Sequence, residues 1–308
     1  MSLLPPISHP GPVAVERCAA ARAEAVPLRF DLHAGKSIER GLARGLDEAE
    51  CDAACIDLHI ARLDPFSYVM PAASPEPGHA AWYSETEIPP GGVTVQRAVA
   101  IVGRRDGATF VHCHGQWRPD AEPLAMGHML PDRCIGADDV QVSGIGLRGG
   151  GFESRHDTET NFRLFRAESR APGCPEPRTA CGRGANTAVL ATLRLNQDVS
   201  QAIASLCEKL RTGPAQLFGI GSLNGAVFES APPMRSYASE LMIRSGRFDP
   251  RTDADGDGDA AHPVHLDVAV VAMDGTIHQG VLSPGCNPVC VTFELVVVPD
   301  AAVHMLDG

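Results

Sequence analysis

Three histidines near the middle of the chain have a spacing suited to metal binding. His112 and His114 are separated by one residue, and His128 follows after a stretch of turn residues. Side chains of a strand alternate between its two faces, so His112 and His114 point to the same side. Imidazole nitrogens bind zinc at about 2.0–2.1 Å, and three of them leave one coordination position open, as in catalytic zinc sites. The spacing therefore predicts a three-histidine site for a divalent metal.

The turn between the two strands decides whether His128 joins the other two imidazoles. Residues 118–123 read RPDAEP, a composition typical of a turn. If the hairpin is centred on Asp120, His128 lies directly across from His112, and the Cβ atoms of such a pair are about 5 Å apart. The alternative is three unrelated histidines on a half-buried sheet, because the sequence does not specify the register.

Polar residues after this hairpin are candidates for catalysis. Glu153, His156 and Glu159 follow within about thirty residues of His128. One of them could orient a histidine through its second nitrogen or act as general base toward water. Arg155 and Arg163 could bind an anionic substrate. The alternative for the whole group is the exposed end of a surface strand.

The predicted helices and strands that must position these residues occur in the same order twice along the chain. The apolar spacing predicts a helix over 37–48 and strands over 56–70, 93–102, 108–117 and 125–130. A Pro/Gly-rich linker follows, and then a helix capped by Asp198 and strands over 217–229, 237–243, 264–273, 276–282 and 289–298. Residues 1–27, rich in Pro and Ala, are expected to be irregular.

Matching residues in the two halves indicate an internal duplication. His265 lies 153 residues after His112, and Cys286 lies 152 residues after Cys134. The positions that match the three histidines are His265, Asp267 and Val281. Two of the three imidazoles are missing there, so we expect the metal in the first half only and a structural copy in the second.

The pattern H-x-H followed by G-H-[LM] resembles the PPC domain (plants and prokaryotes conserved, also called DUF296). His112, His114 and His128 stand at its three histidine positions, and the motifs SGRF (245–248) and GIGS (219–222) resemble further family segments. The resemblance implies an α+β fold of two tandem PPC-like domains, each a bent, mainly antiparallel sheet or barrel with a packed helix. The implied segments are an irregular start (1–27), domain 1 (28–170), a linker (171–189), domain 2 (190–300) and a tail (301–308).

The resemblance also implies function. Single-domain members are trimers, so we expect a homo-oligomer, and the fold class is similar to acetolactate decarboxylase and to a zinc-dependent ester hydrolase. This favours zinc, with iron or nickel as alternatives, and a metal-dependent hydrolase or lyase acting on a small molecule. The alternatives are a DNA-binding or protein-binding regulatory module and an oligomeric scaffold with a structural metal.

Composition narrows these classes. With 26 basic and 38 acidic residues the formal charge is −12, which disfavours direct DNA binding, and the AT-hook that some family members carry is absent. The sequence shows neither a signal peptide at its start nor an apolar run of about 20 residues, so a cytoplasmic, non-membrane protein is expected. Most of the ten cysteines, Cys113 included, are expected to be buried thiols. The acidic loop 253–259 lacks the last ligand of a calcium loop and is expected to be a solvated loop.

Overall fold

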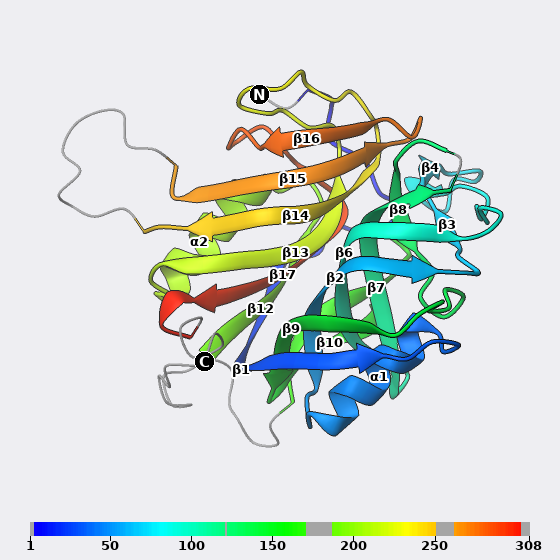
Figure 1. Ribbon diagram of the computed structural model, residues 1–308. Helices are drawn as coiled ribbons and strands as arrows, with labels where there is room; N and C mark the ends of the chain where they lie inside the picture. The colour runs from blue at the N-terminus through cyan, green and yellow to red at the C-terminus, as the bar shows by residue number, and fades with distance from the viewer. Residues whose placement is uncertain (1–2, 121, 171–186, 251–261, 303–308) are drawn as a thin grey trace.

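The computed structural model describes residues 3–120, 122–170, 187–250 and 262–302 (Figure 1). Strands dominate the described residues, and two helices accompany them. The elements of the first half are β1 (Cys18–Leu32), α1 (Ile38–Glu48), β2 (Ala53–Leu63), β3 (Tyr68–Val69), β4 (Pro71–Ala73), β5 (Ala81–Tyr83), β6 (Val93–Arg105), β7 (Ala108–Pro119), β8 (Ala125–Met129), β9 (Val140–Arg148), β10 (Gly150–His156) and β11 (Arg163–Ser169). Those of the second half are β12 (Thr187–Arg194), α2 (Val199–Leu210), β13 (Ala215–Leu223), β14 (Ser239–Phe248), β15 (Val264–Ala272), β16 (Ile277–Val281) and β17 (Val289–Pro299).

One mainly antiparallel sheet runs through both halves. Its main path is β16-β15-β14-β13-β17-β12-β1-β9-β2-β6-β7-β8-β3, and β1 pairs with β12 where the halves meet. The strands β4 and β5 form a separate ribbon. The expected mainly antiparallel architecture is therefore confirmed as an open sheet and not a closed barrel. The division into two tandem domains stays a prediction.

The sheet bends so that strands of the second half face strands of the first (Figure 1). β14 contacts β6, β7 and β8, although it lies far from them along the sheet path. A shared apolar core lies between the facing strands of the two halves. Both halves contribute residues to it, among them Ile101, Met126, Met242 and Val296. This bend brings side chains of β14 and β17 close to those of β7 and β8.

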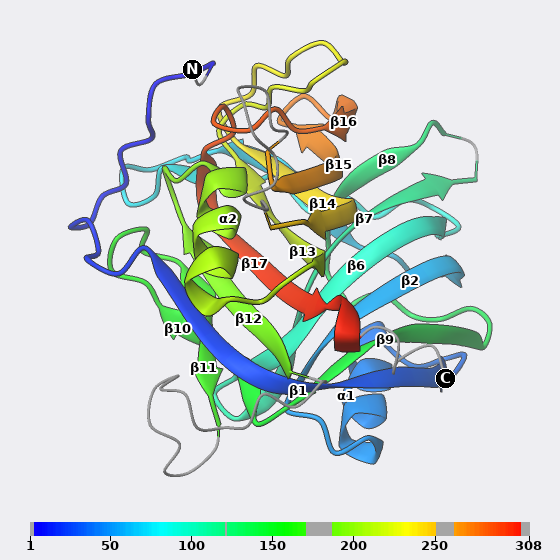
Figure 2. The same ribbon diagram turned by 90° about the vertical axis from the view of Figure 1, so that its left-hand side faces the viewer.

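Each helix covers the outer side of its own half (Figure 2). Helix α1 begins after Ser37, whose Oγ accepts a hydrogen bond from the Arg40 amide, and its predicted stripe of Ile38, Leu42 and Leu46 is buried. Helix α2 begins after Asp198 as predicted, and its Ile203 packs in the core of the second half. Neither helix has the length and hydropathy that a membrane-spanning segment requires, and no other helix of the described residues does either.

Two boundaries differ from the expectation. Residues 18–27 belong to β1 and are not irregular. Their alternating alanines form a buried face, but alanine has little intrinsic preference for strands, so composition did not reveal it. Residues 187–189, expected in the linker, begin β12. The rest of the linker, the acidic loop and most of the tail lie outside the described residues.

Candidate metal centre

The three predicted histidines come together on one face of the hairpin formed by β7 and β8. One nitrogen from each of His112, His114 and His128 lies within 4.8 Å of the others, a group that could hold a metal ion. His112 Nε2 and His114 Nε2 are 3.0 Å apart. The ring centroids of His112 and His114 lie 4.9 and 5.3 Å from that of His128. Among the described residues this is the group of metal-binding side chains that stands out.

The register that produces this convergence differs from the expected one. His128 pairs directly with His114 and not with His112. The last pair of the hairpin is Trp117 with Ala125, so the connection is centred one residue beyond Asp120. A one-residue shift of the centre moves each partner by two positions, which keeps every side chain on its face. The three histidines therefore lie on one face as predicted, although the predicted register was wrong.

The second half of the chain holds two of the imidazoles in place. His114 Nδ1 donates a hydrogen bond of 2.9 Å to the carbonyl oxygen of Leu241 on β14. His112 Nδ1 lies 3.1 Å from Oε2 of Glu294 on β17. Histidines that bind metals usually have their second nitrogen held in this way by a carbonyl or a carboxylate. The second half, expected as a structural copy without a metal of its own, thus contributes contacts to the histidines of the first half.

The hydrogen bond of His114 also determines where its proton lies. A carbonyl oxygen can only accept, so Nδ1 of His114 carries the proton and Nε2 presents a lone pair. His112 Nε2 lies 3.0 Å from this His114 Nε2 atom. Two imidazole nitrogens that share a tetrahedral zinc would be about 3.3 Å apart, given zinc–nitrogen distances of about 2.05 Å. The observed spacing is close to that value.

A second carboxylate from β14 faces the same point. Glu240 Oε1 lies 3.7 Å from His128 Nδ1 and 3.9 Å from His114 Nε2. Glu240 Oε2, Glu294 Oε2 and His128 Nδ1 are buried and have no hydrogen-bond partner among the described residues. Buried polar atoms without partners are rare in native proteins. These three atoms indicate that a further group belongs at this position.

Burial controls the protonation of the whole cluster. It lowers the pKa of His114 to about 3 and that of His128 to about 4, and it places the pKa of His112 well below its usual value. Burial also raises the pKa of both Glu240 and Glu294 to about 7. The imidazoles are consequently neutral at physiological pH, and neutral imidazole is the form that binds metals.

The sequence analysis missed Glu240 and Glu294, although both leave a signal. Glu294 stands between Phe293 and Leu295 in VTFEL, and Glu240 precedes the apolar run Leu241–Ile243 in SELMI. A glutamate next to apolar residues in a strand is expected to be buried and therefore to have a partner. What the pattern does not contain is the identity of that partner in the other half.

A cavity of about 590 Å³ opens beside the three histidines. Glu240 and Glu294 lie at its histidine end, and Arg105, which the sequence analysis did not single out, lies on its wall. Its aromatic walls are Trp82, Tyr83, Phe110, Phe162 and Phe165. The Tyr83 ring meets the His128 ring edge-on, with centroids 5.2 Å apart. The cavity has the mixture of apolar walls and few polar groups that is typical of small-molecule sites.

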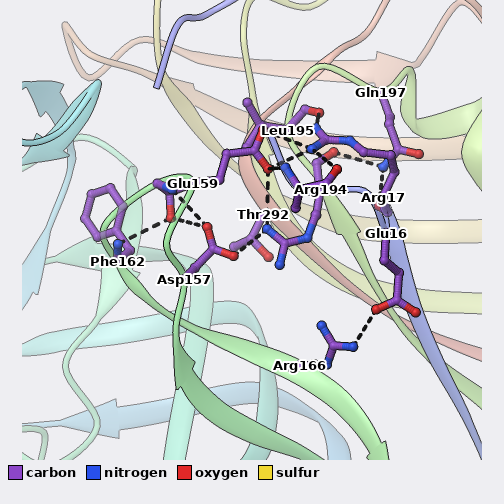
Figure 3. A network of polar contacts seen from close by, with 12 residues as sticks. Glu16, Arg17, Asp157, Glu159, Phe162, Arg166, Arg194, Leu195, Gln197 and Thr292 are labelled. Carbon is purple, nitrogen blue, oxygen red and sulfur yellow. Dashed lines mark hydrogen bonds and ion pairs between the residues drawn. The ribbon is translucent and has the colours of Figure 1, made fainter. Parts of the chain in front are cut away.

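The predicted catalytic candidates are not among the residues that line this cavity. Glu153 forms an ion pair of 2.7 Å with Arg170, and His156 is exposed at the end of β10. Glu159 is buried in a network with Arg17, at 2.7 Å, and with Arg194, at 3.5 Å (Figure 3). These partners give the two glutamates structural contacts.

The two arginines proposed for anion binding are also separated by the structure. Arg155 pairs with Glu168 at 2.9 Å, away from the cavity. Arg163 does line the cavity, and its guanidinium binds Asp106 at 2.8 Å. Cys113 is fully buried beside Met129 on the opposite face of β7, as predicted. Six of the eight described cysteines are buried.

Comparison with solved structures finds likenesses over about half of the chain. A metal-containing protein from Archaeoglobus fulgidus is 21% identical over 45% of this chain and 91% of its own, with a TM-score of 0.36. A plant- and prokaryote-conserved (PPC) protein from Pyrococcus horikoshii is 16% identical over 49% of this chain and 97% of its own, with a TM-score of 0.39. No family model and no curated protein matches the sequence. The structures that the chain resembles thus include a PPC protein, the family named from the histidine pattern.

Proposed function

We propose that His112, His114 and His128 bind one divalent metal ion and that the protein is a metal-dependent hydrolase or lyase acting on a small molecule in the adjacent cavity. The observation that carries the proposal is the convergence of three neutral imidazoles within 4.8 Å, with His114 hydrogen-bonded to the Leu241 carbonyl and His112 within ion-pair distance of Glu294. Zinc suits an all-imidazole donor set best, and iron or nickel are alternatives.

When bound, a divalent ion at this position supplies a Lewis acid that polarises a substrate oxygen or acidifies a water molecule. The chain supplies the rest. Glu240 is the carboxylate nearest to the imidazole nitrogens after Glu294, and its Oε2 is free to accept a proton. A pKa of about 7 suits a group that takes a proton from water and returns it to a leaving group at neutral pH.

Metal content tests the binding half of this proposal. Protein purified without a histidine tag is expected to contain about one equivalent of metal per chain, and His112→Ala and His128→Ala are expected to lose it. His265→Ala is the matched control, because His265 is exposed on β15 at the position that corresponds to His112. Retention of one equivalent by the His112→Ala and His128→Ala variants would place the metal elsewhere.

The role of Glu240 is tested by the conservative variant Glu240→Gln. We expect this variant to keep its metal and to hydrolyse a nitrophenyl ester about 10²–10⁴-fold more slowly, the usual contribution of general acid–base catalysis. An unchanged rate would exclude Glu240 from proton transfer. Loss of metal would instead make Glu240 a fourth ligand of a closed site, which would favour the structural-scaffold alternative.

A further inference from the structure

Arg105 is a cation of the cavity wall that forms no ion pair within the described part of the chain. It stands at the end of β6, where its Nε donates a hydrogen bond of 3.2 Å to Ser154 Oγ. Its guanidinium carbon lies 3.5 Å from the centroid of the Phe110 ring. Among the described residues no carboxylate oxygen lies within 4.0 Å of its guanidinium nitrogens. Two of the nitrogens therefore remain free to donate.

The other charged groups of the wall differ from Arg105 in this respect. Arg163 already binds Asp106 at 2.8 Å and the carbonyl oxygen of Ser154 at 3.3 Å. Asp106 and Glu39 are close enough for their charges to interact with Arg105, but both carboxylates lie beyond ion-pair distance from it. A half-buried guanidinium without a counter-ion is unfavourable in the free protein, and an anion bound there would offset that penalty.

Arg105 also lies within electrostatic reach of the histidines. Burial is the main reason for the low pKa of His112 and His128, and the positive charge of Arg105 lowers both further. One small molecule in this cavity could therefore place an anionic group on Arg105 and a second polar group at the histidines. Its volume of about 590 Å³ is in the range that holds such a molecule.

The remaining wall specifies the body of that molecule. Phe110 and Phe165 line the cavity near Arg105. Trp82 and Tyr83 line it as well, and 36% and 40% of their surfaces stay exposed. An apolar ligand would cover these rings.

We infer that the cavity binds a small organic carboxylate with an aromatic or aliphatic body, whose carboxylate is held by Arg105 and whose reacting group faces the three histidines. The part of this inference that concerns the reacting group rests on the proposed function. The part that concerns Arg105 does not. A planar guanidinium with free nitrogens forms two parallel hydrogen bonds to a carboxylate, which a lysine cannot reproduce. Arg105 is thus a specificity-determining residue.

The test uses two probes of the same shape, 3-phenylpropionate and its neutral amide, with calorimetric titration of the zinc-loaded protein and of the metal-free protein. The native protein is expected to prefer the carboxylate by about tenfold or more. Arg105→Gln is expected to bind both probes equally, and Arg105→Lys is expected to retain a reduced preference. Arg155→Gln, an exposed arginine paired with Glu168, is the matched control and should behave as the native protein.

Each outcome decides one part of the inference. Equal binding of the two probes by the native protein, or no binding of either at millimolar concentration, overturns it. A preference that persists in Arg105→Gln also overturns it, because the carboxylate would then be bound elsewhere, for example at the metal. If Arg105→Gln does not fold, as judged by circular dichroism, Arg105→Lys carries the test. Metal content, measured separately for each variant, shows whether the proposed function itself has failed.

Discussion

Replacing Glu294 by Gln is expected to weaken metal binding while it stabilises the metal-free protein. Glu294 is 1% exposed, and its Oε2 lies 3.1 Å from His112 Nδ1. Gln keeps the size of the side chain but removes the negative charge that orients His112 and increases its basicity. Removal of such a partner typically weakens metal binding by about 10–100-fold, which corresponds to about 1.4–2.7 kcal/mol.

The metal-free protein is expected to respond in the opposite direction. Burial raises the pKa of Glu294 from 4.5 to about 7, so the native state holds this proton more tightly than the unfolded chain. The resulting stabilisation is fully present below pH 4.5 and is lost as the pH rises through about 7. That loss is at most about 3 kcal/mol, and Gln, which does not titrate, avoids it. The free energy of unfolding of Glu294→Gln should therefore exceed that of the native protein at about pH 8.

Two measurements at about pH 8 check this pair of effects. Competition with a chelator gives the zinc affinity, and urea denaturation of the metal-free protein gives the free energy of unfolding. Glu229→Gln, a substitution outside the cavity, serves as control. Zinc affinity equal to that of the native protein would refute the role of Glu294 in orienting His112. A less stable metal-free variant would refute the assignment of a buried, unfavourable carboxylate.

Three further predictions concern stability. Below pH 6.5 the metal-free protein should lose stability down to about pH 4, because the lowered pKa of His112, His114 and His128 makes the unfolded chain bind three protons that the native state does not. The raised pKa of the two buried carboxyl groups offsets this loss only in part. The urea midpoint as a function of pH measures the loss of stability, and a midpoint that does not change with pH would contradict the prediction. Gly127→Ala should destabilise the protein by about 1–3 kcal/mol, because the new Cβ would lie 2.5 Å from the Val69 carbonyl oxygen. Gly78→Ala, whose new Cβ would have its nearest neighbour at 3.8 Å, should melt at the same temperature as the native protein. Equal melting temperatures of the two variants would refute the close approach of Gly127 to Val69. Arg17→Met should cost about 1–3 kcal/mol in urea denaturation, because it leaves the buried Glu159 with a 3.5 Å contact to Arg194 and a 3.2 Å hydrogen bond from the Ala14 amide. Arg155→Met, which breaks an exposed pair, should cost less than about 1 kcal/mol; the reverse order would argue against the network in Figure 3.

Alternation along a strand was sufficient to predict the histidine face, but the partners across the hairpin were not predictable. His112 and His114 point to one side whatever the turn does, since that depends only on the two-residue period. The pairing of His114 with His128 depends on how the residues between Trp117 and Ala125 are arranged, and several arrangements satisfy the same composition. The same limit applies to β1, whose alanines carry little strand preference of their own.

The contacts that the second half makes with the histidines could not be predicted from the sequence, for a different reason. Leu241 and Glu294 lie more than a hundred residues from the histidines that they contact, and the contact depends on the bend of the whole sheet. Local pattern does not contain that information. Treating the two halves as copies also directed attention to the missing histidines at Asp267 and Val281, and away from the acidic residues of β14 and β17.

The two supports behind the histidines differ in how they respond to mutation. His114 is held by a main-chain carbonyl, which every residue type at position 241 would still provide. His112 is held by a side chain, which a single codon change at position 294 alters. Natural variation and laboratory evolution can therefore adjust affinity for the ion through one position while the geometry of its neighbour is inherited unchanged. In such a metal centre the contact to His112 can change by mutation, whereas the contact to His114 cannot.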